Sequence, residues 1–429
     1  MNPSVPKRSL PGALPSGPVE HVVFWGMLSP FLLYFSGLEP LRIPLTVWPA
    51  ILISFALVLK SSRPISWLSW LWLACMSGLL IQQVFFFQKY DVGGWTLPGW
   101  FLGLGIAGVL PMVGQFVRPQ VVYFAAALLG IQALIYCAIA GIAVQAGFEP
   151  HYRSPLPQFD ILESAYYNVR LTQSSSADDA EQRLIAFAPY ATSAGATACF
   201  FAILTLGARA SWFKWTGLAG WLLLLLLARA RTGIICTAVA IAFFHLLSIR
   251  RRYLLLIAGA GVIVLSAFAG PITRGAEEAR DYLHALRWDS SLDRNNLKSI
   301  ALSGWRYGER PALGNGTSIP GGAVVTHVPI GTHDSLAGGL FLRGALGVSL
   351  MLLPILVTLV FGSVSGTSPT HRIVAASAAV MVIYTYSQTL TEIFMFMWPL
   401  FLLIGAASRQ EELPESLPAS TLCTPSALH

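Results

Sequence analysis

Two arginines stand at a junction between apolar runs, in a sequence where charged residues are scarce. Arg229 and Arg231 lie between the runs at 213–228 and 232–249. A guanidinium stays charged at any relevant pH and binds a phosphate through two parallel hydrogen bonds. The pair therefore indicates anion capture, with Arg231 the stronger candidate. The alternative interpretation is that both side chains only reach out to lipid headgroups.

His333 is the residue best suited to proton transfer. It lies just before an apolar run that begins near Ser335, and a neutral imidazole can act as a general base near pH 7. Adjacent residues cannot align as nucleophile, base and orienting group, so His333, Asp334 and Ser335 do not form a catalytic triad. Asp334 and Ser335 instead occupy the N-cap position of the helix that the run predicts. A histidine that only caps this helix or contacts headgroups is the alternative.

The segment that leads to His333 is both basic and aromatic. Arginines hold phosphates, and aromatic rings stack on the C–H faces of pyranose sugars, so this composition suits a ligand that carries both. A solvated loop helix, whose acids pair with its bases, is the alternative for any single arginine. The glycine-rich stretch at 311–316 predicts a tight loop that folds back on the membrane. The basic and aromatic residues are Arg274, Arg280, Arg287, Arg294, Lys298, Arg306, Arg310, Tyr282, Trp288, Trp305 and Tyr307.

Three further charged residues lie at or inside apolar runs, where charge is costly and usually functional. Arg183 directly precedes the run at 187–207. Glu392 lies in the turn before the last run, where it pairs with an arginine, orients His333, or is simply a solvated acid. Arg343 lies ten residues after His333. That separation is about 15 Å along a continuous helix, unless the glycines around Arg343 break the helix.

The composition shows which class of protein these residues belong to. Of the 429 residues, 55% are hydrophobic and only 11% are charged, whereas a soluble domain carries about 25% charged residues. The apolar residues come in runs of roughly 17–25, the length that crosses a bilayer as a helix. A soluble enzyme, a nucleic-acid binder and a disordered protein are thereby excluded.

The apolar runs predict an all-α integral membrane protein with about twelve transmembrane helices. Two longer segments, 148–186 and 272–334, do not span, and the second lies between the ninth and tenth helices. The tails at 1–20 and 408–429 are short and polar, and we expect them to be disordered, so that the transmembrane domain covers 21–407. The predicted spans are 21–38, 43–59, 66–87, 95–117, 120–147, 187–207, 213–228, 232–249, 253–271, 335–362, 372–388 and 391–407.

The basic residues of the short loops indicate how the chain is oriented. If the N-terminus is cytoplasmic, Lys60, Arg63, Arg118, Arg209 and the arginines at 250–252 all fall on the cytoplasmic side, as the positive-inside rule requires. Both long segments then lie outside, in the periplasm of a bacterium with two membranes, and both termini lie inside. The net charge of +7 therefore reports orientation, and no nucleic-acid partner is expected.

The five cysteines give no sign of a disulfide framework or of a metal site. Cys75, Cys137, Cys199 and Cys236 lie in apolar runs and Cys423 lies in the tail, without the spacing of metal ligands. We therefore expect neither a metal ion nor a cofactor.

At these residues the chain resembles the bacterial family of O-antigen ligases and O-antigen or exopolysaccharide polymerases. The stretch Arg231-Thr232-Gly233 is similar to the family's Ser-Arg-Gly/Thr, and Arg294 lies seventeen residues before a Pro-x-x-Gly-x-Gly stretch at 311–316, with Trp305 between them. The turn at 333–336, His-Asp-Ser-Leu, leads to the Gly-x-x-Gly stretch at 344–347. About twelve spans with one large outer loop complete the likeness, which covers the last two thirds of the chain.

The resemblance implies an all-helical inner-membrane glycosyltransferase whose site faces the periplasm. The donor would be a glycan on undecaprenyl diphosphate and the acceptor a sugar hydroxyl, and transfer would invert the anomeric carbon without a metal ion. Arg231 and Arg294 would hold the diphosphate, with Arg183 as a lesser candidate, and His333 would deprotonate the acceptor as the catalytic base. The candidates for supporting roles are Arg229, Arg306 and Glu392.

The chain departs from the family pattern at two positions. Ala230 replaces the small polar residue that commonly precedes the arginine, and Arg343 stands near the place where many members carry an acid. The second departure bears on the acceptor environment more than on the type of reaction.

Within the family, the Gly-Thr-His-Asp-Ser turn at 331–335 favours a polymerase of O-antigen or exopolysaccharide repeat units over a ligase that moves the glycan to lipid A–core. A polysaccharide-related transporter or flippase is the alternative from another class, but its site would be expected at the midplane, whereas these charges gather at one membrane face. The expected partners are the undecaprenyl-linked glycan, the acceptor glycolipid (a lipid-linked repeat unit or lipid A–core) and membrane lipids. A flippase and a chain-length regulator are further candidate partners.

Overall fold

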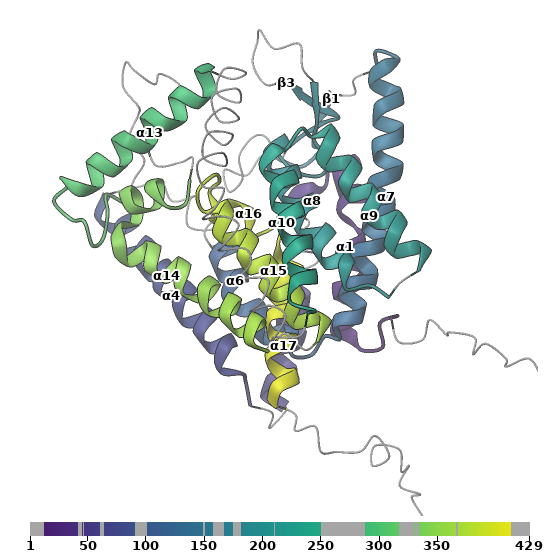
Figure 1. Cartoon of the computed structure of the whole chain (residues 1–429), viewed down its shortest axis with the longest axis horizontal. Helices are drawn as coiled ribbons and strands as arrows, with labels where there is room; N and C mark the ends of the chain where they lie inside the picture. The colour runs from purple at the N-terminus through teal and green to yellow at the C-terminus, as the bar shows by residue number, and fades with distance from the viewer. Residues whose placement is uncertain are drawn as a thin grey trace, which may run out of the picture.

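The computed structural model describes residues 13–41, 45, 47–60, 64–90, 101–148, 151–157, 167–174, 182–209, 211–249, 288–316, 330, 334–365 and 368–412, and most of these residues are helical (Figure 1). The helices are α1 (Pro18–Leu28), α2 (Pro30–Phe35), η1 (Glu39–Leu41), α3 (Trp48–Lys60), α4 (Trp67–Tyr90), η3 (Phe101–Gly105), α6 (Ile106–Gly114), α7 (Pro119–Gln145), α8 (Ala191–Leu206), α9 (Trp212–Leu227), α10 (Arg231–Leu246), α13 (Trp288–Arg306), α14 (Ala337–Val364), α15 (Pro369–Tyr384), α16 (Leu390–Ile393) and α17 (Trp398–Glu412).

Three of the described helices are long and apolar enough to cross a membrane: Trp67–Phe86 in α4, the whole of α7, and the whole of α14. The surface of α7 carries exposed Ile135, Ile139 and Ile142, which are spaced so that they form one stripe on a helix. A broad exposed apolar surface of this kind is typical of a side that faces lipid. The chain is therefore mostly helical with three candidate membrane helices, which supports the prediction of a membrane protein.

The predicted spans 120–147, 213–228 and 232–249 coincide with α7, α9 and α10 to within three residues at each end. Three other predicted spans are interrupted, and the break in 335–362, at Gly344, is described with the site. The span 21–38 breaks between α1 and α2 because Pro30 has no N–H to donate and starts a new helix. The span 391–407 divides into α16 and α17 at a turn over 394–397. The predicted span 253–271 lies outside the described residues.

The first and last described helices extend into the segments that were predicted to be tails. Helix α1 begins at Pro18, inside the expected tail 1–20, and α17 continues to Glu412, beyond the expected boundary at 408. The C-terminal extension is held by hydrogen bonds, since Ser408 Oγ lies 2.7 Å from Ser66 Oγ and Arg409 Nη1 donates to the carbonyl of Gln115 at 2.6 Å. Polar contacts with other helices therefore order residues that look like solvated tail in the sequence.

The start of α1 is held by an ion pair that joins it to the start of α7. Arg118 donates from Nε and Nη2 to the two carboxylate oxygens of Glu20, at 2.8 and 2.7 Å, and the backbone N–H groups of Arg118 and Ser16 also donate to this carboxylate. Burial raises the pKa of Glu20, but these hydrogen bonds and the charge of Arg118 outweigh burial and lower the pKa to about 2.

This ion pair predicts a defined loss of stability in acid. A carboxylate whose pKa is lowered on folding contributes stability above its unfolded pKa of 4.5 and loses it as the pH falls toward 2. We expect Glu20→Gln to lower the stability of the protein in detergent by about 1–3 kcal/mol at pH 7, and the deficit to shrink as the pH falls below 4.5. Thermal unfolding of both proteins from pH 7 to pH 3 tests this, and a deficit that stays constant with pH would contradict it.

The long segment 148–186 contains two short hairpins, which add a little sheet to an otherwise helical protein. Strand β1 (His151–Arg153) pairs antiparallel with β2 (Asn168–Arg170), and β3 (Thr172–Ser174) pairs with β4 (Gln182–Leu184). Tyr34 Oη donates to the carbonyl of Arg170 at 2.6 Å and Tyr136 Oη to that of Ile185 at 3.1 Å. These bonds fix the hairpins to α2 and α7.

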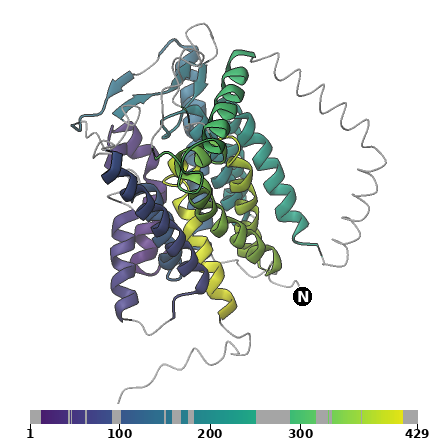
Figure 2. The ribbon, with the colours of Figure 1, turned by 90° about the vertical axis from the view of Figure 1, so that its left-hand side faces the viewer.

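Both long connections lie at the same end of the helix bundle. Figures 1 and 2 show the hairpins and α13, from the second long segment, at one end, and the C-terminal end of α17 at the other. The described parts of both segments therefore lie at one end of the bundle, and the side of a membrane that this end faces stays a prediction.

Glycines bring pairs of helices into backbone contact. A Cβ added at Gly220 would lie 1.9 Å from the carbonyl oxygen of Gly130, which joins α9 to α7. A Cβ at Gly405 would lie 1.7 Å from the oxygen of Pro111, which joins α17 to α6. We call these two contacts the glycine seams. Small residues of this kind allow the close packing by which membrane helices associate.

Candidate functional site

The arginine pair predicted to capture an anion lies in the turn between α9 and α10. Helix α9 ends in a Schellman turn, in which the N–H of Arg229 donates to the carbonyl of Leu226 and the N–H of Ala230 to that of Leu225. Arg229 itself is left-handed, with φ of 50°, at a position usually occupied by glycine. Arg231 is the first residue of α10, and both arginine side chains are exposed.

The left-handed backbone of Arg229 predicts a trade between stability and activity. Arg229→Gly should stabilise the protein by about 1 kcal/mol because glycine adopts this conformation without strain. If the charge of Arg229 supports anion binding, the same variant should be less active. Arg229→Ala is the matched control, since it removes the charge and keeps the strain. Thermal unfolding should rank the glycine variant above the alanine variant, and equal midpoints would contradict the prediction.

Helix α8 is the support on which this turn rests. A Cβ added at Gly195 would lie 2.0 Å from the Cβ of Ala230, and one added at Gly233 would lie 3.0 Å from the carbonyl oxygen of Gly195. The turn and α8 therefore touch through small residues. The close approach of Gly195 leaves room only for a small side chain at position 230, where the chain has alanine.

Arg183 lies in β4 and is buried, with 8% of its surface exposed. Its Nε and Nη2 have no hydrogen-bond partner within the described part of the chain. Directly opposite Arg183 in the hairpin is Gln173, whose side-chain oxygen accepts from the N–H of Ala191, the first residue of α8, at 3.0 Å. Arg183 was predicted as a lesser anion ligand, and the hairpin pairs it with Gln173, the residue whose side chain reaches the N-terminus of α8.

His333, the predicted base, lies outside the described residues, but the two residues after it are held firmly. Asp334 caps α14, because its Oδ1 accepts from the N–H groups of Ala337 and Gly338. The Oγ of Ser335 donates to the carbonyl of Gln388 at 2.8 Å and accepts from the N–H of Leu390 at 2.7 Å. The predicted capping role is confirmed for Asp334, and Ser335 fastens the segment to the turn before α16.

The same turn also receives α13, the helix that carries Arg294. Lys298 Nζ donates to the carbonyl of Tyr386 at 2.7 Å, and Arg294 lies one helical turn before Lys298. Glu392 lies in α16, which begins at Leu390. The side chains of Arg294 and Glu392 are outside the described part of the structure, so their predicted roles stay predictions.

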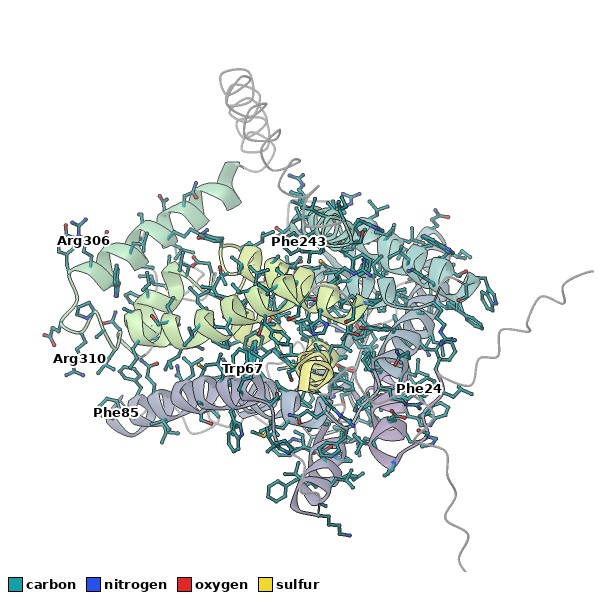
Figure 3. All side chains as sticks on the ribbon, turned by 60° about the horizontal axis from the view of Figure 1, so that its bottom comes forward. Phe24, Trp67, Phe85, Phe243, Arg306 and Arg310 are labelled. Atoms are coloured by element: carbon teal, nitrogen blue, oxygen red, sulfur yellow. The ribbon has the colours of Figure 1, made fainter. Side chains whose placement is uncertain are left out.

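Arg306 is not brought to this region. It is exposed at the far end of α13, with its guanidinium carbon 5.8 Å from the centre of the Tyr307 ring. Figure 3 shows Arg306 and Arg310 at the same edge of the molecule as Phe85 of α4, away from Phe243 of α10. Among the residues that the structure describes, no other predicted site residue lies beside Arg306, so its supporting role stays a prediction.

The helix after His333 is broken, which was one of the two alternatives for Arg343. Gly344 interrupts α14 with φ of 63° and ψ of −173°. The glycine-rich loop 311–316 fills the break: the N–H of Asn315 donates to the carbonyl of Phe341 and the N–H of Ala345 to that of Pro311. We call this arrangement, loop 311–316 bonded to residues 341–346, the latch.

One polar residue at the latch, Gln82, was not singled out from the sequence. Gln82 of α4 donates from Nε2 to the carbonyls of Leu313 and Arg343, at 3.1 and 2.7 Å. Arg343 Nη2 lies 3.4 Å from Thr391 Oγ1 in α16. The break thus turns Arg343 back toward the turn that holds Ser335. The signal available in the sequence for Gln82 was the presence of a polar glutamine inside an apolar run.

An apolar groove of about 820 Å³ runs between α7 and the α1–α2 pair. Leu171, which follows β2, is one of the residues that line the groove. The groove therefore extends to the hairpins. Its walls suit a hydrocarbon chain and offer few polar atoms. The lining residues include Trp25, Phe31, Phe35, Ile135, Tyr136, Ile139, Phe148 and Leu171.

The described residues hold no group of three or more His, Cys, Asp and Glu side chains arranged to bind a metal ion. What they gather instead are cationic side chains, a helix N-terminus and an apolar groove at one end of the bundle, which is an arrangement able to bind an amphiphile with a phosphate head.

No protein-family model matches the chain, and no curated protein is similar enough to count as a relative.

Proposed function

We propose that the chain is a glycosyltransferase of the bacterial inner membrane that takes a glycan from undecaprenyl diphosphate and joins it to a sugar hydroxyl on the periplasmic side. Its reaction is the polymerisation of O-antigen or exopolysaccharide repeat units. The proposal includes about twelve spans, with both termini in the cytoplasm, and requires no metal ion.

The observation that carries the proposal is the position of α8. This helix contacts the turn with Arg229 and Arg231 through Gly195, and it also contacts α16. The turn before α16 binds Ser335, two residues after His333, and binds Lys298, one helical turn after Arg294. The elements that carry the proposed base and the proposed diphosphate ligands are therefore anchored around the same two helices.

The chemistry assigned to these residues is a single displacement. The acceptor oxygen attacks the anomeric carbon, the bond from that carbon to the diphosphate oxygen breaks, and the configuration inverts. His333 takes the proton of the acceptor hydroxyl, and the charge that grows on the diphosphate is neutralised by Arg231 and Arg294. Proton removal and stabilisation of the leaving group are the two contributions that lower the barrier.

Reconstitution tests the proposal. Purified protein in liposomes is given an undecaprenyl-diphosphate-linked glycan in the presence of EDTA, and glycan products are separated by size. We expect product from the natural protein and a loss of about 10²–10⁴-fold in His333→Ala. His151→Ala is the matched control, because His151 is exposed on β1 and should leave the rate unchanged. Full activity of His333→Ala would overturn the assignment of the base.

The acceptor distinguishes the polymerase from the ligase. A polymerase extends the glycan when only the donor lipid is present, whereas a ligase forms product only after lipid A–core is added. A transporter or flippase would move the glycolipid across the liposome membrane without forming a new glycosidic bond, and that result would contradict a transferase of either kind.

A further inference from the structure

The buried guanidinium of Arg183 is the least explained charge in the described structure. Its side chain is 92% buried, and its Nε and Nη2 find no hydrogen-bond partner within the described ranges. A buried charge without a partner is strongly unfavourable, because the group loses its hydration and gains nothing in return. The energetic argument calls for an anion at this place.

The hairpin register directs Arg183 toward the N-terminus of α8. Residues opposite one another in an antiparallel pair have side chains on the same face of the ribbon, with Cβ atoms about 5 Å apart. Arg183 is opposite Gln173, and Gln173 already reaches the N–H of Ala191 at the start of α8. The register therefore puts Arg183 on the same face of the ribbon as the side chain that reaches the first turn of this helix.

The start of α8 is itself an anion-binding feature. Helix α8 has sixteen residues, and its N-cap, Tyr190, makes no capping hydrogen bond through its side chain. The first N–H groups of a helix have no acceptor within the helix and carry partial positive charge. Gln173 satisfies only that of Ala191, which leaves the N–H groups of Thr192 and Ser193 as donors at this end of the helix.

A second arginine, from β2 of the other hairpin, approaches the segment that leads into α8. Arg170 Nη2 lies 3.4 Å from the carbonyl of Pro189, two residues before α8, and its Nε is buried without a hydrogen-bond partner among the described residues. Two guanidinium groups and a helix N-terminus thus share one sign of charge. An anion bound at such a cluster would stabilise it.

We propose that Arg183, Arg170 and the first turn of α8 form a binding site for a phosphate group, supplied either by the headgroup of an anionic lipid or by a soluble phosphate. Phosphate fits because it accepts from several donors at once and matches the planar fork of a guanidinium. The proposal goes beyond glycan transfer: binding here requires no glycosidic chemistry, and it can hold or fail independently of the proposed function.

Binding measurements on the full-length protein test the site. In detergent, the probes are inorganic phosphate and inorganic diphosphate, and in nanodiscs they are phosphatidylglycerol against phosphatidylcholine. We expect Arg183→Gln to weaken binding of the effective probe about 10-fold or more, since charge-assisted hydrogen bonds are lost. Arg153→Gln, at an exposed position on β1, is the matched control and should bind within about 2-fold of the natural protein, as expected for a surface charge.

The outcomes separate the two sources of phosphate. Binding of inorganic phosphate or diphosphate supports a soluble ligand, and a preference for phosphatidylglycerol alone supports a lipid headgroup. Absence of binding by every probe would overturn the proposal, as would an equal loss in Arg153→Gln, which would indicate only general attraction to a basic surface. If Arg183→Gln does not fold, Arg170→Gln takes its place with the same control and the same expectation.

Thermal unfolding supplies a second readout whose sign is distinctive. In buffer without phosphate or anionic lipid, Arg183→Gln should unfold at a higher temperature than the natural protein, because it removes an uncompensated buried charge. With the effective probe present, the order should reverse, since only the natural protein gains from binding. A lower midpoint for Arg183→Gln without any anion would show that an acid of the chain pairs with Arg183, and the proposal would then be wrong.

Discussion

Replacing Arg231 with alanine is expected to lower kcat for glycan transfer by about 10²–10³-fold, the usual cost of removing one preorganised donor to a developing negative charge. The exposed guanidinium at the start of α10 is free to meet a diphosphate, and the small residues Gly195, Ala230 and Gly233 fix the backbone beneath it. Arg231→Lys should restore part of the rate only, because an ammonium group supplies charge but not two parallel hydrogen bonds.

The control for this prediction is an arginine at the other end of α8. Arg209 is exposed just after α8 ends, so Arg209→Ala removes the same charge from the protein without touching the α9–α10 turn. Its activity should equal that of the natural protein in the same liposome assay. Equal losses in the two variants would show that total charge matters and that the position of Arg231 does not.

Replacing Gly344 with alanine is expected to destabilise the protein by about 2–5 kcal/mol, which combines backbone strain with overpacking. The residue has φ of 63°, and an added Cβ would lie 2.4 Å from the carbonyl carbon and oxygen of Ala312. Alanine would therefore have to push loop 311–316 out of the latch. Because the latch supports the start of α14, which follows His333, activity should fall together with stability.

Gly141→Ala is the matched control for the latch. Gly141 lies within α7, and nothing lies within 4 Å of a Cβ added there, so alanine should stabilise the helix slightly, by about 0.5–1 kcal/mol. Thermal unfolding in detergent and transfer activity are measured for both variants. An unchanged unfolding midpoint in Gly344→Ala would mean that α14 does not need its break.

Much of the helical framework could be predicted from the sequence because hydrophobic runs report helices directly. The run 120–147 corresponds to α7, and the choice between a continuous and a broken helix at Arg343 was recognised from the adjacent glycines. Pro30 could also have indicated a break, but the apolar residues of 21–38 continue on both sides of it and favoured one unbroken span. The three-residue strands of the hairpins were too short to give a period-2 pattern.

The site was harder to predict than the helices, since its residues meet through contacts between distant parts of the chain. Charge in an apolar setting was enough to select Arg183 and Arg231. Nothing in the local sequence distinguishes α8, whose Ala- and Gly-rich stretch looks like any other span, or Gln173, whose role depends on a hairpin register. Gln82 bonds to carbonyls more than two hundred residues away, and no local pattern reveals such a partner.

The glycine seams have a consequence for how the protein should be handled once it is taken out of the bilayer. Detergent tails cannot enter a contact in which Gly220 meets the backbone of Gly130, or Gly405 that of Pro111. Helix α13, by contrast, is held to α14 by a small apolar cluster around Leu297, Ala301 and Phe341. Solubilised samples should therefore keep their helical signal and their size on a column while the outer helix loosens, so that monodispersity is a poor guide to active protein and mild, lipid-supplemented extraction is the better choice.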